Sequence, residues 1–484
     1  MRTIRRSPDR ATGIGHRAPV FPRTAHRAPL TLAALLLLSA PLAAQQRQTP
    51  PAGGTPRDFR LPEPRQFTLD NGMGVTLVQY GTVPKVAVQL YVRVGNVNES
   101  ANEVFLADLT GDLMREGTAT RNAAQISAQA AAMGGDVFIN TGLDETTVAG
   151  DVLGDYAGDF IRLIADIVRN PAFPESELAR LKANMVRNIT VQQRSPQSQA
   201  LVRFRETMYP DHPYGRIYPT AEMVNGYTIQ QIRDWHRNQW GAQRANITVA
   251  GRFDARAVEA AIREAFGSWE RGPAPVLNVP NPVTQRSLQT VDRPGAPQST
   301  LLVGIPTPNP SSPEWIPLSV TNTLLGGYFS SRITANLRED KGYTYSPFSS
   351  LSTRYRDTYW AENADVTTAN TGASLHEIFY EVDRLRNAPP TPEELQGVQK
   401  YLAGNFVLAN SSRFGVANQL NYVRLHGLGR EYLTNYVRNV MAVTPQDVQR
   451  IAQQYLDPAR MLIVVTGDLN VIRDQIQPYG TTTP

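Results

Sequence analysis

The sequence contains no cysteine and only six histidines among its 484 residues. The absence of cysteine excludes disulfides, thiolate zinc sites, iron–sulfur clusters and a cysteine nucleophile. Six histidines leave little imidazole for metal binding or for acid–base catalysis. Apolar residues make up 41% and charged residues 19%, an ordinary balance for a globular protein. The length corresponds to two or three domains.

Long apolar runs are also scarce, and the strongest one lies near the N-terminus. Residues 30–40 carry no charge, follow seven arginines and precede small residues that end at Ala44. As a helix this run rises only about 16 Å, too little to cross a hydrocarbon core of roughly 30 Å. The pattern is typical of a secretory signal peptide cleaved near Ala44. An uncleaved anchor and a twin-arginine leader (Arg5-Arg6) are the alternatives.

The sequence therefore predicts a signal peptide over residues 1–44, a disordered linker over 45–61, and a periplasmic or extracellular location. Residues 1–44 carry seven arginines and one acid, a charge of +6, which leaves −1 for the remainder of a chain of +5. A nearly neutral chain after residue 44 lacks the excess positive charge that is typical of nucleic-acid-binding proteins. No later stretch reaches 18 apolar residues, so we expect no transmembrane segment in the mature chain.

The body of the sequence is a duplication. Residues 228–254 align without a gap with residues 444–470, at an offset of 216. Each copy begins with a threonine that suits a helix N-cap (Thr228, Thr444) and ends in a β-branched run closed by glycine. A proline-rich stretch separates the copies. The expected boundaries are an N-terminal domain, a linker, a C-terminal domain and a tail, over residues 62–270, 271–288, 289–478 and 479–484.

Strands and helices are segregated within each copy, which predicts an α+β fold with a mostly antiparallel sheet layered by helices on one side. Asn71-Gly72 favours a hairpin before residues 75–78. Residues 86–94 and 300–306 are corresponding strands, and either could be an edge strand that pairs with a peptide. The expected helices cover about 103–116, 123–133, 155–169, 175–193 and 313–325.

Several motifs, in order, resemble the M16 (insulinase/pitrilysin) metallopeptidase family, in the two-domain branch that includes mitochondrial processing peptidase. They are Phe67–Gly72, Arg115–Thr118, His212–Gly215 and Leu337–Ser346. The resemblance covers about residues 62–478. It implies two tandem homologous domains of the LuxS/MPP-like metallohydrolase fold, and it implies peptide substrates.

The resemblance also implies where a zinc site would lie, and this sequence departs from the family pattern there. The family's His-x-x-Glu-His motif supplies two zinc ligands and a general base, and a distant Glu completes the ligands. Here the two histidine positions hold Asp108 and Asp112, the base position holds Gly111, and the distant position holds Asn188. We therefore predict no metal in this chain. Binding of a hard cation by Asp108 and Asp112 remains an alternative.

The other histidines, His212, His236, His376 and His426, are dispersed without a pair at metal-ligand spacing. We expect them to be surface or packing residues.

A second set of residues lies in the C-terminal copy. Arg338 and Tyr345 are seven apart, and the resemblance implies that such a pair reaches the scissile carbonyl from the second domain. The alternative is a helix-terminal Arg beside an edge-strand Tyr, and Tyr343 is a rival for the phenol role. Small residues that could contact a peptide precede the pair: Gly326, Gly327, Ser330 and Ser331. The alternative for that segment is a helix C-cap followed by a turn.

The functional hypothesis is a non-catalytic M16-type subunit that forms a heterodimer. The expected partner is an M16 peptidase chain with an intact His-x-x-Glu-His motif, which would carry the zinc, while Arg338 and Tyr345 would stabilise substrate and oxyanion in trans. One alternative is an exported peptide-binding or scaffold protein with no proteolytic role. A self-sufficient metalloendopeptidase is the third possibility.

Overall fold

The computed structural model describes Gly54 and residues 59–483. The chain divides into residues 1–55 and residues 56–484, and the helices and strands of the described residues belong to the second unit. The expected signal peptide and most of the expected linker lie outside the described residues. No helix in the described part is long and apolar enough to cross a bilayer.

The N-terminal half contains six strands and eight α-helices in the described residues. The strands are β1 (Arg65–Thr68), β2 (Gly74–Gln79), β3 (Lys85–Val92), β4 (Phe138–Thr141), β5 (Thr146–Leu153) and β6 (Ala245–Gly251). The helices are α2 (Leu106–Met114), α3 (Ala123–Ala132), α4 (Ala157–Arg169), α5 (Glu175–Gln193), α6 (Pro196–Met208), α7 (Ala221–Gly226), α8 (Ile229–Gln239) and α9 (Ala255–Phe266).

The C-terminal half repeats this composition within the described residues. Its strands are β7 (Ser287–Asp292), β8 (Gln298–Pro306), β9 (Phe348–Arg354), β10 (Asp357–Thr367), β11 (Leu462–Gly467) and β12 (Thr482–Thr483). Its helices are α10 (Trp315–Leu325), α11 (Arg332–Thr334), α12 (Thr371–Asn387), α13 (Pro392–Ala409), α14 (Arg413–His426), α15 (Glu431–Ala442), α16 (Pro445–Tyr455) and α17 (Leu469–Ile476).

Five neighbouring strands of each sheet share one order, and only the outermost strand differs (β1 in the first sheet, β12 in the second), which confirms the duplication and the α+β class. The first sheet runs β1-β2-β6-β3-β5-β4 and the second runs β12-β7-β11-β8-β10-β9. Most neighbours are antiparallel, except that β2 pairs with β6, and β7 with β11 and β12, in parallel. The aligned threonines act as predicted, because Thr228 and Thr444 each cap a helix (α8, α16) with a reciprocal capping box.

The expectation that residues 86–94 or 300–306 form an edge strand is wrong. Strand β3 lies between β6 and β5, and β8 lies between β11 and β10. Both strands are almost continuously buried, and a near-continuous apolar run marks a strand covered on both faces rather than an edge. The edges near the candidate residues are β4 in the first sheet and β9 in the second.

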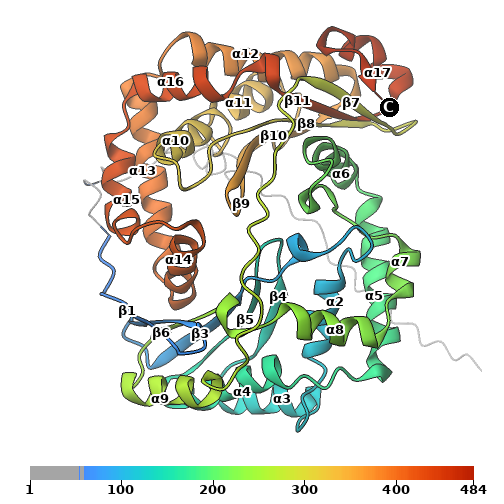
Figure 1. Cartoon of the computed structure of the whole chain (residues 1–484). Coiled ribbons are helices and arrows are strands. Elements are labelled where there is room, and N and C mark those ends of the chain that lie inside the picture. Colours follow the sequence, from blue (N-terminus) through green and yellow to red (C-terminus); the bar gives the residue numbers. More distant parts are fainter. Residues whose placement is uncertain (1–53, 55–58, 484) are drawn as a thin grey trace, which may run out of the picture. The chain divides into compact units, whose positions relative to one another are not determined.

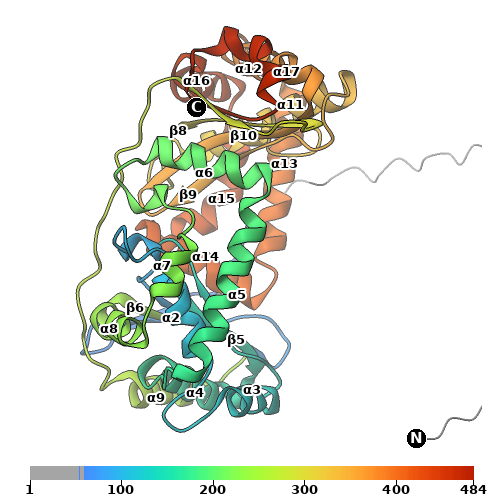
Figure 2. The same cartoon turned by 90° about the vertical axis from the view of Figure 1, so that its right-hand side faces the viewer.

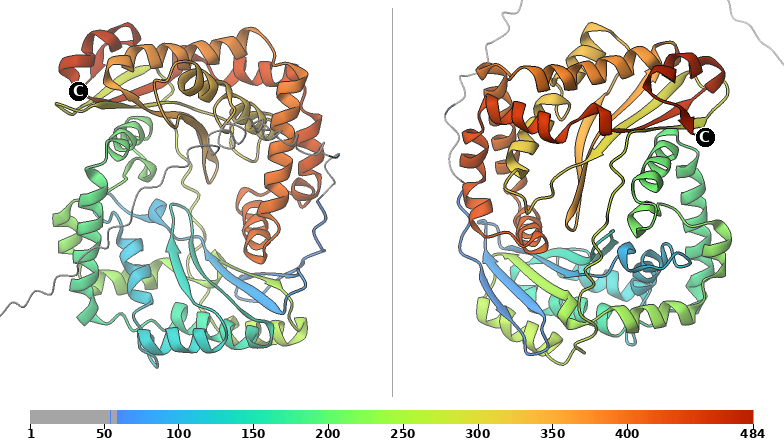
Figure 3. Two further views of the ribbon diagram at one scale, coloured as in Figure 1. Left: turned by 180° about the vertical axis from the view of Figure 1, so that it is seen from behind. Right: turned by 45° about the horizontal axis from the view of Figure 1, so that its top comes forward.

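Helices cover both faces of each sheet, not one face as expected, and the halves exchange a helix to achieve this. Helix α6 of the N-terminal half packs on β7, β8 and β11, while α14 of the C-terminal half packs on β3 and β6. Figure 1 shows α12 and α16 on one side of the second sheet and α6 on the other. The views in Figures 2 and 3 show α5 leading directly into α6.

Two core clusters therefore contain residues of both halves. In one, Ala200, Phe204 and Met208 of α6 contact Leu302 and Val464 of the second sheet. Their spacing of four residues places them on one face of α6. In the other cluster, residues of α13, α14 and α15 contact Val78 and Ala250 of the first sheet.

The ends of the described chain also differ from the expected linker and tail. Leu61 is buried, and Phe59 stacks edge-on against Phe406. At the other end, residues 482–483 add β12 to β7, and Tyr479 stacks on Phe379. Residues 267–286 form no helix or strand, while β7 begins at Ser287, within the expected linker.

Candidate functional site

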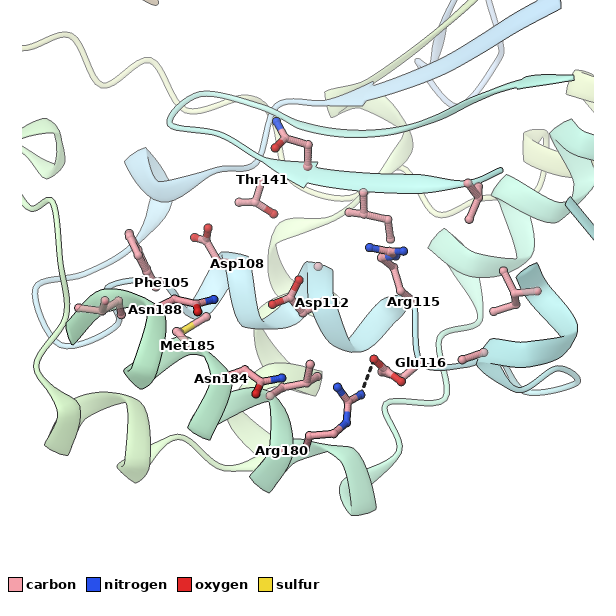
Figure 4. Close-up of a pocket in the computed structure, with 18 of the residues that line it drawn as sticks. Phe105, Asp108, Asp112, Arg115, Glu116, Thr141, Arg180, Asn184, Met185 and Asn188 are labelled. Carbon is pink, nitrogen blue, oxygen red and sulfur yellow. Dashed lines mark hydrogen bonds and ion pairs between the residues drawn. The ribbon is translucent and has the colours of Figure 1, made fainter. Parts of the chain in front are cut away.

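A pocket of about 570 Å³ lies between α2, α5 and the edge strand β4. Figure 4 shows the side chains of Asp108 and Asp112 on α2 opposite Asn184 and Asn188 on α5. The two members of each pair are four residues apart, so each helix presents its pair on one face. The structure therefore brings Asp108, Gly111, Asp112 and Asn188 into one pocket.

The start of α2 is fixed by an unusual backbone and a buried acid. Phe105, which lines the pocket, has a φ of 66°, a left-handed conformation that is strained for a bulky residue. The Glu99 carboxyl accepts hydrogen bonds from the backbone N–H of Phe105 (3.0 Å) and of Ala107 (2.9 Å). These bonds satisfy donors that the first turn of a helix otherwise leaves free.

Asn96 connects this buried acid to the pocket. Its amide donates to Glu99 (3.2 Å) and to Asp108 (2.6 Å). Burial raises the pKa of Glu99 to about 8 and that of Asp108 to about 6, and it also raises the pKa of Asp112. Glu99, which lies behind the pocket, is therefore largely protonated at neutral pH.

The pocket residues do not fit a catalytic zinc ion. Two carboxyl groups and one neutral amide are weak, hard donors for zinc compared with imidazole. No group of three His, Asp, Glu or Cys side chains in the described part of the chain could hold a metal. A Cβ added to Gly111, the position predicted to correspond to the family's base, would lie 2.8 Å from Thr141 Oγ1, so a side chain there requires Thr141 to shift.

The four histidines in the described part of the chain contribute no imidazole pair to the pocket. His212 and His426 are buried, His376 is exposed, and Nε2 of His236 contacts the Val168 carbonyl at 2.9 Å. Burial lowers the pKa of His236 and of His426 to about 4, so both rings are neutral at physiological pH.

The second set of candidate residues lines another pocket, of about 240 Å³, in the C-terminal half. It contains Gly326, Gly327, Arg338 and Tyr345 but none of the residues of the first pocket. Arg338 lies in a π-helical turn over residues 335–340, and Gly342 (φ 66°) then reverses the chain. Such turns are rare and often occur at functional sites.

The Arg338 guanidinium contacts two aromatic rings. Its central carbon is 4.5 Å from the ring centre of Phe329 and 4.9 Å from that of Tyr345. The Tyr345 side chain is 78% exposed, whereas the rival Tyr343 packs against the core of this half. The phenol that accompanies Arg338 in the pocket is thus Tyr345.

The small residues before Arg338 have structural tasks of their own. Gly326 is the C-cap of α10, and a Cβ there would lie 2.7 Å from Glu362 Oε2. A Cβ on Gly327 would lie 2.8 Å from the Thr323 backbone. Ser331 is buried with its hydroxyl bonded to Thr334 (2.9 Å), while Ser330 is exposed and outside the pocket lining.

Three features of the two pockets were not predicted from the sequence. They are the Asn96–Glu99 connection, the strained Phe105 and the stacking of Phe329 on Arg338. Glu99 stands three residues after Asn96 and six before Phe105, so a search for acids just before α2 would have found it. The other two depend on backbone conformation and tertiary packing.

Comparison with known proteins agrees with this geometry. The family described as Insulinase (Peptidase family M16) matches residues 75–220, and Peptidase M16 inactive domain matches residues 226–402. The chain belongs to the M16 peptidase family. An uncharacterized zinc protease of Mycobacterium tuberculosis is 28% identical over 411 residues, covering 81% of this chain and 91% of the relative. The uncharacterized zinc protease YmxG of Bacillus subtilis is 26% identical over 410 residues, covering 84% and 99%.

Solved structures share the fold of this M16 chain. A peptidase M16 inactive domain from Pseudomonas fluorescens superposes with a TM-score of 0.78 at 21% identity, covering 84% of this chain and 98% of that one. A protease from Helicobacter pylori gives 0.78 at 19%, covering 84% and 100%. The periplasmic protease PqqL from Escherichia coli gives 0.73 at 16%, covering 86% of this chain and 47% of that chain.

Proposed function

We propose that this chain is a non-catalytic M16 subunit that pairs with a zinc-bearing M16 chain to degrade or process peptides. The observation that carries the proposal is the chemistry of the first pocket. Its helix α2 presents Asp108 and Asp112 where the family has histidines, and Gly111 packs against Thr141 where the family has its base. The chain keeps the fold of a peptidase but lacks the donors for its own zinc.

The second pocket supports a contribution to a shared active site. Arg338 contacts the rings of Phe329 and Tyr345, and the exposed phenol of Tyr345 is free to donate a hydrogen bond. A fixed guanidinium and a phenol suit the carbonyl oxygen of a peptide and the oxyanion that develops from it. We propose that Arg338 and Tyr345 supply these groups to a site whose zinc belongs to the partner.

The test compares the mature chain alone with a mixture of the chain and a co-exported M16 protein that carries His-x-x-Glu-His. Only the mixture should hydrolyse a quenched fluorescent peptide. Arg338→Ala in this chain should lower kcat of the mixture by about 10²-fold, as loss of one oxyanion-stabilising donor does. Arg438→Ala, an exposed arginine on α15, is the matched control and should leave the rate unchanged.

Two results would refute the proposal. One is peptide hydrolysis by the singly purified chain at a rate comparable with that of the mixture. The other is a mixed complex whose hydrolysis rate does not respond to Arg338→Ala.

We also propose that the chain is exported. The support is the arginine-rich segment followed by residues 30–40 and by small residues up to Ala44. Mass spectrometry of the protein from its native host should show a mature N-terminus at Gln45. An intact N-terminus at Met1 on a cytoplasmic protein would contradict this location.

An exported peptide-binding protein without a peptidase partner is the second candidate function. The exposed aromatic side chains around Arg338, which are Phe329, Tyr345 and Phe348, favour it, because they offer a binding surface in the chain alone. Copurification from the periplasm distinguishes the two functions. A stable complex with a zinc-bearing M16 chain supports the first, and its absence at native levels supports the second.

A further inference from the structure

The Arg338 guanidinium contacts two aromatic rings, while its two Nη groups have no hydrogen-bond partner among the described residues. Within residues 59–483 its Nε forms an ion pair with the adjacent, 60% exposed Glu339 carboxylate at 3.2 Å. The ring centres of Phe329 and Tyr345 lie 4.5 and 4.9 Å from its central carbon. An arginine held by aromatic rings with both Nη groups free can bind a planar carboxylate through these paired N–H donors.

The surroundings of Arg338 offer apolar contact to whatever carries such an anion. The pocket of about 240 Å³ is lined by Phe348, Pro347 and Tyr328 in addition to the stacked rings. Phe329 is 65% exposed, Phe348 52% and Tyr345 78%. Large apolar side chains in this degree of exposure form a surface that a ligand side chain can cover.

One more element reaches the pocket, and it has unused backbone groups. Strand β9 is the edge of the second sheet and begins at Phe348 in the pocket wall (Figure 1). The Ser349 N–H bonds to the Gly326 carbonyl (3.0 Å), on the side away from β10. Alternation along a strand then directs the N–H and C=O of Leu351 and Thr353 to the same side. Neither residue has a backbone partner there among the described residues.

We propose that the isolated chain binds the free C-terminus of an extended peptide, whose backbone pairs with β9 and whose carboxylate is held by Arg338. Strand addition of this kind takes its affinity from main-chain hydrogen bonds and its specificity from adjacent pockets. The terminal side chain of the peptide would contact Phe348 and Tyr345, which selects an apolar or aromatic residue.

The direction of the peptide follows from the position of the charge. A peptide antiparallel to β9 ends near Phe348, at the start of the strand, and therefore brings its carboxylate to the pocket of Arg338. A parallel peptide would instead place its ammonium group beside the guanidinium, and like charges repel. This binding requires no partner chain and so goes beyond the proposed shared active site.

The test uses the full mature chain and an N-terminally labelled, extended octapeptide that ends in Phe, measured by fluorescence anisotropy. The free acid should bind about tenfold or more tightly than the C-terminal amide, because a hydrogen bond to a charged group is at stake. A third peptide, amidated but with Glu before the last residue, separates a terminal carboxylate from a side-chain one. It should bind no better than the simple amide.

Variants then locate the contacts. Arg338→Gln should remove the preference for the free acid, whereas Arg438→Ala should not affect it. Leu351→Pro removes one outward N–H without a bond to β10 and should weaken binding about tenfold. Hydrogen exchange on the wild-type chain should show new protection of the Leu351 and Thr353 amides when the free acid is bound.

Equal affinity for the acid and the amide would overturn the proposal, as would acid preference that survives Arg338→Gln. Tighter binding of the amidated Glu peptide than of the free-acid peptide would also overturn it, because the site would then recognise a side-chain carboxylate instead of the C-terminal one. None of these measurements uses a zinc-bearing partner. A negative result here therefore leaves the proposed shared active site untouched.

Discussion

Gly111 is the residue of the first pocket at which α2 packs against β4. Its α-carbon faces β4, where a Cβ would lie 2.8 Å from Thr141 Oγ1 and 3.4 Å from Ile139 Cγ2. A side chain at position 111 therefore requires Thr141 to shift.

This packing predicts the effect of restoring the acid. Gly111→Glu should lower the free energy of unfolding by about 1–3 kcal/mol, the usual effect of overpacking. Thr141→Ala removes the Oγ1 that the new side chain meets, so it should recover most of the loss in the double variant. Chemical denaturation of the four proteins measures the coupling, and additive effects of the two changes would contradict the contact.

A second residue, Glu99, predicts how stability depends on pH. In the folded protein burial raises its pKa from 4.5 to about 8, so the folded state keeps a proton that the unfolded state releases between these values. The free energy of unfolding should therefore fall as pH rises from about 4.5 to about 8. Urea titrations at several pH values measure this slope.

Glu99→Gln should make that slope shallower, because glutamine does not titrate. The raised pKa of Glu362 and of Asp108 leaves part of the slope in place. Glu222→Gln, on the exposed start of α7, serves as the control and should leave the profile unchanged. A profile that Glu99→Gln does not alter would show that this carboxyl is ionised in the folded protein.

Among the elements, α6 connects the two halves most directly. Phe204 is fully buried against the second sheet, where it contacts the edge of Tyr359 with ring centres 5.1 Å apart. A Cβ on Gly304 of β8 would lie 2.6 Å from the Phe204 ring, so glycine at that position creates the space for the helix. One aromatic side chain thus holds a helix of the first copy on a sheet of the second.

We expect Phe204→Ala to lower the free energy of unfolding by about 3–5 kcal/mol, through lost burial and a cavity between α6 and β8. Glu206→Ala, on the exposed face of the same helix, should change it by less than about 0.5 kcal/mol. Denaturant titrations compare the two. A small effect of Phe204→Ala would mean that α6 does not contribute to the stability of the second sheet.

At the scale of the whole described molecule, the halves share cores and charges. The α6 and α14 clusters each contain residues of both copies. Arg413 of α14 bonds to Asp151 of β5 at 3.0 Å, and Asn421 bonds to Glu145 at 2.7 Å. Neither copy covers both faces of its own sheet without the other.

The two halves should therefore unfold together although each has its own sheet. Calorimetry of the mature chain should give a single transition with equal calorimetric and van't Hoff enthalpies. Phe204→Ala should lower the midpoint of that transition without splitting it. Two resolved transitions in the wild-type chain would contradict a shared core.

The sequence by itself determined the duplication, the α+β class and the grouping of Asp108, Gly111 and Asp112 on one helix. These follow from local order along the chain: capping threonines, strand periodicity, and the short spacing from Asp108 to Arg115 that places the motif on one helix. Spacing within an element survives folding, so a pattern read along the chain remains valid in the structure.

Only the tertiary structure decided that β3 and β8 are internal, that α6 and α14 exchange sheets, and that Phe329 stacks on Arg338. Each of these depends on contacts between residues that are distant in sequence or on a π-helical turn. An apolar helix face in the sequence indicates that the helix packs against another element, but it does not identify that element. Which element covers a given face depends on how all the apolar faces are buried together. No single stretch of sequence contains that information.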